Sequence, residues 1–99
     1  MPPQISAIGW YREEDYQRII AISDDGHVFH PNYADWLKAA ERTFENMENM
    51  PGVIALKVYI YPKTFPIWCE ANGMKIDAKA RLAYGNFRAY DHAKKIGLI

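Results

Sequence analysis

The alternation of side chains between residues 53 and 61 is the feature that most constrains the fold. Its even-numbered positions are all aliphatic, whereas its odd-numbered positions mix apolar, basic and tyrosine residues. Because side chains alternate between the two faces of a β-strand, this pattern predicts a strand with one buried face and one partly wet face. Pro62 ends the strand, since proline has no amide proton to donate to a neighbouring strand.

Residues 5–11 are apolar, end in two aromatic residues and predict a second strand. Two helices are expected between the strands. The first covers about residues 12–22, where three consecutive acids favour the positive end of the helix dipole. The second begins after Asn32, a good N-cap residue that Asp35 complements, and it ends before Pro51.

Two further helices are expected after the second strand. Thr64 caps a short one, which ends at Gly73 because glycine tolerates the left-handed backbone of a helix terminus. Asp77 caps the last helix, which carries two apolar stripes. The stripe expected to face the core consists of Ala80, Ala83, Tyr84, Phe87 and Tyr90. The stripe that predicts a second neighbour consists of Ala78, Leu82, Ala89, Ala93 and Ile96.

The predicted fold is therefore α+β, in the order strand, helix, helix, strand, helix, helix, with all 99 residues in one domain. Four helices pack on a small two-stranded sheet. A right-handed crossover through two helices would let the strands run parallel, but the pattern leaves their direction open. A sheet of two strands is thin, so pairing with a second copy of the chain would widen it.

The composition excludes several classes of protein. Basic and acidic residues balance at 12 each, which is unlike a dedicated binder of nucleic acid or anionic membrane. No apolar run is long enough to span a bilayer, and the lone Cys69 fits a reducing cytoplasm. The six glycines are scattered and form no phosphate-binding loop, so no cofactor is expected.

The charge is nevertheless uneven along the chain. Residues 12–50 hold four basic and nine acidic residues, whereas residues 72–99 hold six basic and two acidic ones. Complementary surfaces within or between copies are the simpler explanation. A nucleic-acid-binding regulator is the alternative, and it would use Lys75, Lys79, Arg81 and Arg88. A helix-turn-helix motif over residues 65–82 fits poorly, because two of its apolar positions fall on polar residues.

Two small groups of residues suggest catalysis only weakly. Asp24, Asp25, His27 and His30 could hold a divalent metal in a small metal-dependent enzyme, although aspartate and histidine are also frequent in plain turns. Cys69 lies next to Trp68 on an apolar helix face, where a buried structural cysteine is expected instead of a nucleophile.

The favoured prediction is a non-enzymatic protein-interaction module that acts as a homodimer. Tyrosine beside lysine on a half-wet strand face is typical of a protein contact with a polar rim. The second stripe of the last helix would serve self-association. The candidate interaction residues are Lys57, Tyr59, Tyr61, Ala89, Ala93 and Ile96.

The strand and proline, followed by Phe65-x-x-Trp68-Cys69, Gly73 and then Ala80-Arg81, form a loose pattern over most of the chain. This pattern resembles a group of small bacterial proteins to which no activity is assigned. The resemblance implies a small bacterial cytoplasmic protein and no particular chemistry. Within the pattern, Arg81 is the polar residue of most interest, and Glu70 or the carbonyl groups near Gly73 are its expected partners.

Overall fold

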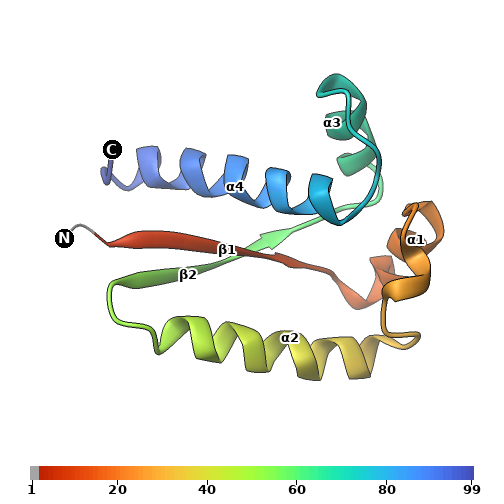
Figure 1. The fold of residues 1–99 in the computed structure, drawn as a ribbon, viewed down its shortest axis with the longest axis horizontal. Coiled ribbons are helices and arrows are strands. Elements are labelled where there is room, and N and C mark those ends of the chain that lie inside the picture. Colours follow the sequence, from red (N-terminus) through yellow and green to blue (C-terminus); the bar gives the residue numbers. More distant parts are fainter. Residues whose placement is uncertain (1–2) are drawn as a thin grey trace.

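A computed structural model describes residues 3–99 and confirms the predicted fold class and order of elements. Four α-helices pack on a two-stranded sheet (Figure 1). The elements in chain order are β1 (Gln4–Trp10), α1 (Glu13–Ile22), a 3₁₀ turn (Gly26–Val28), α2 (Tyr33–Glu48), β2 (Val53–Tyr59), α3 (Phe65–Ala71) and α4 (Ala78–Lys95). No helix in this described part of the chain is both long and apolar enough to cross a membrane.

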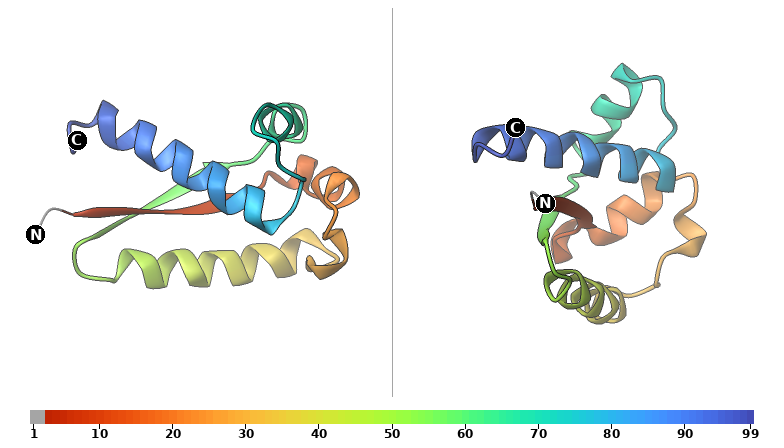
Figure 2. Two further views of the ribbon diagram at one scale, coloured as in Figure 1. Left: turned by 45° about the horizontal axis from the view of Figure 1, so that its top comes forward. Right: turned by 60° about the vertical axis from the view of Figure 1, so that its left-hand side comes forward.

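The two strands run parallel and in register, from Gln4 opposite Val53 to Trp10 opposite Tyr59. Helix α4 lies on one face of the sheet and α2 on the other, as the views in Figures 1 and 2 show. Because β1 and β2 are the only strands within residues 3–99, each strand has an outer edge that no other strand covers.

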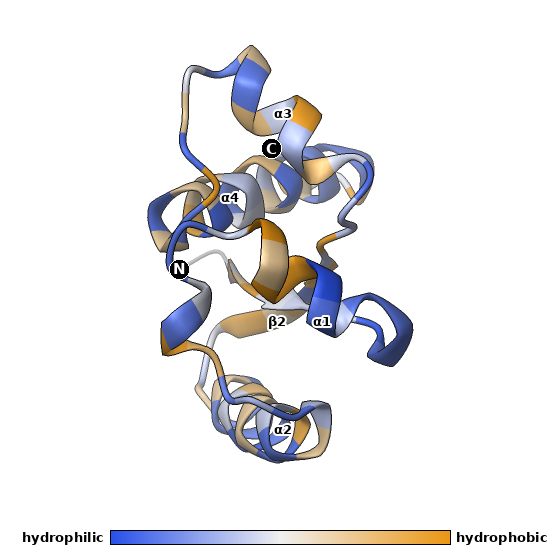
Figure 3. Ribbon diagram, turned by 90° about the vertical axis from the view of Figure 1, so that its right-hand side faces the viewer, coloured by the Kyte–Doolittle hydropathy of each residue, from blue (hydrophilic) through white to orange (hydrophobic). Residues whose placement is uncertain are grey.

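The alternation that predicted β2 is confirmed best at its carboxyl end. Val58 and Ile60 are buried there, whereas Tyr59 and Tyr61 are exposed. Figure 3 shows that hydrophilic and hydrophobic residues are mixed along α2, as expected for an amphipathic helix.

The largest fully buried side chains all belong to residues that follow the carboxyl ends of the strands, and Tyr16 of α1 is the largest of them. Its ring is fully buried, and its hydroxyl donates a 2.6 Å hydrogen bond to the carbonyl oxygen of His30. The rings of Tyr11, Tyr33 and Trp36 all lie within 6 Å of the Tyr16 ring, measured between centroids. Aromatic packing of this kind fixes α1 and α2 against the end of the sheet.

Two of the three predicted helix caps are confirmed. The Asn32 and Asp77 side chains each accept a backbone N–H three residues ahead, at 2.9 and 3.0 Å respectively. The cap assigned to Thr64 is wrong. Thr64 precedes α3, but its own backbone is already helical and its hydroxyl makes no capping bond. An N-cap side chain reaches the first turn from an extended backbone, which Thr64 lacks.

The stripe of α4 expected to face the core is partly wrong. Ala80 is buried as expected, but Phe87 and Tyr90 are exposed and the buried positions farther along are Gly85 and Ala89. The cause is close contact with β1. A Cβ atom built on Gly85 would lie 3.5 Å from Cβ of Ala7, so only small residues fit between the helix and the strand.

Gly85 offers a direct test of this packing. We expect Gly85→Ala to raise the free energy of unfolding by about 0.5–1 kcal/mol, because alanine favours a helix and its methyl group fits at ordinary contact distance. We expect Gly85→Leu to lower it by about 1–3 kcal/mol, because the larger side chain separates α4 from β1. Urea unfolding of the two variants measures both changes, and a stable leucine variant would contradict the close contact.

Candidate interaction surfaces

The two sides of α4 differ in chemistry, and each lies beside a different strand. On the β1 side, α4 forms a groove with β1 and the last residues of the chain, and none of the described residues that line it has a charged side chain. We call it the β1-side groove. It is lined by Pro3, Ile5, Asn86, Ala89, Tyr90, Ala93, Leu98 and Ile99.

Exposed apolar side chains extend the β1-side groove along α4. Tyr90 and Ile99, which line it, are 59% and 67% exposed. Leu82 and Ile96 lie one helical turn before Asn86 and one turn after Ala93, on the same side of the helix, and are 65% and 50% exposed. Exposed apolar side chains gathered on one side of a helix are the kind of surface at which proteins form contacts.

On its other side, α4 faces the outer edge of β2 across a wider groove of about 560 Å³. We call it the β2-side groove. Its charged residues are mainly basic, with one carboxylate among them. The lining consists of Leu56, Lys57, Val58, Tyr59, Tyr61, Thr64, Tyr84, Arg88, Asp91, His92 and Lys95.

Along the strand side of the β2-side groove, aromatic and basic side chains pack against one another. The Tyr59 and Tyr61 rings are nearly parallel, at 12° and with their centroids 6.2 Å apart. The Lys57 ammonium lies 4.3 Å from the centre of the Trp10 ring, and the Arg12 guanidinium lies 4.8 Å from that of Tyr61. Cation–π contacts of this kind hold the strand residues in place at the rim of the groove.

The structure therefore divides the predicted interaction residues between two surfaces. Lys57, Tyr59 and Tyr61 line the β2-side groove. Ala93 lines the β1-side groove, and Ile96 is exposed beyond it. Ala89 is a correction to the predicted set: although its edge borders the groove, it is 7% exposed and forms part of the packing under α4.

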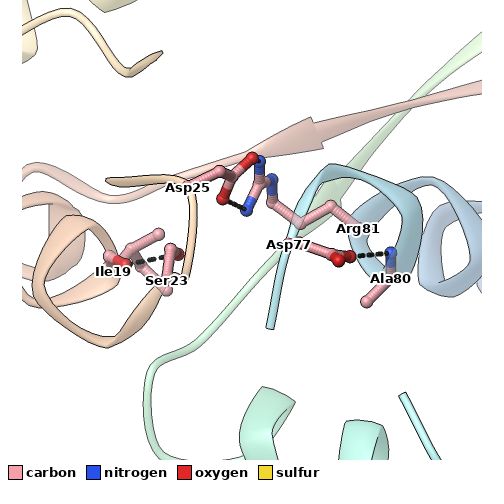
Figure 4. A network of polar contacts seen from close by, with 6 residues as sticks. All are labelled: Ile19, Ser23, Asp25, Asp77, Ala80 and Arg81. Atoms are coloured by element: carbon pink, nitrogen blue, oxygen red, sulfur yellow. Dashed lines mark hydrogen bonds and ion pairs between the residues drawn. The ribbon is translucent and has the colours of Figure 1, made fainter. Parts of the chain in front are cut away.

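The basic residues assigned to nucleic-acid binding are not equivalent. Lys75, Lys79 and Arg88 are exposed. Arg81 instead forms a two-pronged ion pair with Asp25, with nitrogen–oxygen distances of 2.6 and 3.0 Å (Figure 4). The expectation that Arg81 would pair with Glu70 or with the turn at Gly73 is wrong, because the loop after α1 places Asp25 directly opposite its guanidinium.

In the loop proposed to hold a metal, the Asp25 side chain and the His30 backbone already make structural contacts. Both carboxylate oxygens of Asp25 are bonded to Arg81, and this guanidinium keeps the pKa of the carboxyl group below its ordinary value. The backbone carbonyl of His30 accepts the Tyr16 hydroxyl. Among residues 3–99, no three His, Cys, Asp or Glu side chains come close enough together to form a metal site.

Cys69 is buried, as the sequence predicts. It is 1% exposed, and burial raises the pKa of its thiol. Burial also raises the pKa of Tyr11 to about 12. A thiol that is out of contact with solvent and favours its protonated form is a poor nucleophile.

Sequence reasoning missed the α4 half of the β2-side groove. Tyr84, Arg88, His92 and Lys95 recur at spacings of four, four and three along the helix, which places them on one side of it. That spacing is visible in the sequence, but the open strand edge that it faces is not. Comparison of the chain with protein-family models, curated proteins and solved structures finds no match.

Proposed function

We propose that this protein is a non-catalytic protein-interaction module that acts as a homodimer. The observation that carries the proposal is the apolar side of α4, where Leu82, Tyr90 and Ile96 are each at least half exposed beside a groove with no charged side chain among its described lining residues. In an isologous dimer the same patch meets itself across a twofold axis, so a mainly apolar patch is self-complementary, with Lys94 beside it at 5.2 Å from the centre of the Tyr90 ring. The polar face of the helix stays free for another partner.

We also propose that the protein belongs to the bacterial cytoplasm. The support is the single free cysteine, which is buried and has no disulfide partner, together with the resemblance of its motifs to those of small bacterial proteins.

The dimer is tested by sedimentation velocity of the whole chain. We expect a concentration-dependent dimer, and we expect Leu82→Glu to weaken association by at least about a hundredfold, because the twofold axis puts two buried carboxylates into the contact. Ile67→Glu is the matched control, since Ile67 is also 65% exposed but belongs to α3. A wild-type chain that stays monomeric at high concentration would contradict the proposal.

Nucleic-acid binding is the second candidate. Arg81 is paired with Asp25, but Lys75, Lys79 and Arg88 are exposed. This candidate makes a different prediction: affinity for oligonucleotides should fall steeply with added salt, as phosphate contacts release counterions. The same sedimentation experiment, repeated with mixed oligonucleotides at low salt, distinguishes the two functions.

A further inference from the structure

We propose that the β2-side groove binds an extended acidic segment of a partner protein, which adds to the outer edge of β2 as a further strand. This proposal goes beyond the dimer and is independent of it, because the two grooves lie on opposite sides of α4. Two features of the groove support the proposal: the open backbone edge of β2 and the charge of the groove lining.

The first feature is the open strand edge. Within residues 3–99, β2 pairs with β1 alone, so the backbone groups along its outer side have no neighbouring strand. An added strand supplies matching donors and acceptors along its whole length, which is the usual mode by which sheet edges bind peptides. The β2-side groove runs along this edge, so it has the direction that an extended peptide requires.

The second feature is charge complementarity. The groove contains the basic side chains of Arg88 and Lys95 against the single carboxylate of Asp91, whereas Lys57 lies at its rim with its ammonium over the Trp10 and Phe44 rings on the α2 side. Asp91 lies 3.2 Å from Lys95 and neutralises it locally, whereas Arg88 has no ion-pair partner among the described residues. Arg88 is therefore the main free cation, and a carboxylate is its natural counterpart.

The two rims of the groove predict a pattern in the bound segment. Side chains of a strand point alternately to opposite faces, so every second residue of the peptide would face α4 and its Arg88. The residues between would face the opposite side, where Tyr59 and Tyr61 are exposed. The expected ligand therefore alternates acidic residues with apolar ones.

Single-stranded nucleic acid is the other polyanion that a tyrosine-lined groove could take. The geometry favours the peptide for two reasons. Base stacking needs free aromatic faces, but one face of the Tyr61 ring already carries the Arg12 guanidinium. The edge of β2 also offers backbone donors and acceptors in the spacing of another strand, which a nucleic acid does not match.

Fluorescence anisotropy with a short labelled peptide of alternating glutamate and valine tests the site. We expect Arg88→Glu to weaken binding by about tenfold, because it places like charges together in the groove. Lys79→Glu is the matched control: it makes the same charge change on the same helix at an exposed residue outside the groove, and it should leave affinity within about twofold. Equal losses in both variants would overturn the site.

Two further probes decide the mode of binding. A version of the same peptide with all its backbone nitrogens methylated cannot donate hydrogen bonds to a strand edge and should not bind, so equal affinity for it would overturn strand addition. A labelled oligothymidylate should bind more weakly than the acidic peptide, and tighter binding that depends on Arg88 would overturn the peptide in favour of nucleic acid. The Leu82→Glu variant should keep peptide binding, so failure of the dimer and failure of the groove are separable outcomes.

Discussion

Replacing Tyr16 by alanine is expected to lower the free energy of unfolding by about 4 kcal/mol, a large part of the total stability of a small domain. The ring is fully buried, with 0% of its surface exposed, and it contacts the rings of three other aromatic residues. Alanine leaves a cavity among them. It also removes the hydroxyl that donates to the His30 carbonyl, so that the loop before α2 loses its tie to α1.

Urea unfolding of Tyr16→Ala, Tyr16→Phe and Tyr90→Ala separates the contributions. Tyr16→Phe keeps the ring and loses the hydrogen bond alone, which should cost about 1 kcal/mol. Tyr90→Ala removes the same type of side chain from a site that is 59% exposed, and should cost less than about 1 kcal/mol in the monomer. A Tyr16→Ala variant as stable as Tyr90→Ala would contradict the central position of Tyr16 in the core.

The sequence predicts the elements of this fold because their signals are local. The alternation in β2 and the caps at Asn32 and Asp77 depend on residues a few positions apart, and each is confirmed. The orientation of α4 depends on what lies beneath it. Large aromatic residues at helical spacing suggest a core face, but Gly85 is the residue that lies against Ala7, whereas Phe87 is half exposed beside Trp68 of α3.

The candidate sites show the same division. Lys57, Tyr59 and Tyr61 can be chosen from the sequence because they alternate along one strand. Their neighbours Arg88 and His92 come from α4, much later in the chain, and only the packing of α4 beside β2 brings the two sets into one groove. The pairing of Arg81 with Asp25, 56 positions away, also could not be predicted from the sequence, since no local spacing relates the two residues.

The second large effect is expected at this ion pair. Asp25→Ala should lower the free energy of unfolding by about 2–3 kcal/mol, because it leaves the guanidinium of Arg81, whose side chain is only 12% exposed, without its carboxylate. The pair joins the loop after α1 to the start of α4, so its loss loosens contacts between the two halves of the chain. Asp91→Ala is the control. Its ion pair with Lys95 is far more exposed, and its loss should cost about 0.5 kcal/mol or less.

The contribution of Asp25 should also depend on pH, in a direction that the ion pair fixes. Arg81 lowers the pKa of the Asp25 carboxyl group below its ordinary value of 3.8, so folding favours the ionised form. The stabilisation is therefore complete above the unfolded-state pKa and is lost as the pH falls through the lower value of the folded state. Urea unfolding of wild type and Asp25→Ala at neutral pH and in acid should show the gap between them narrowing in acid. A gap that stays constant or widens would mean that a carboxylate paired with Arg81 is not what stabilises this junction.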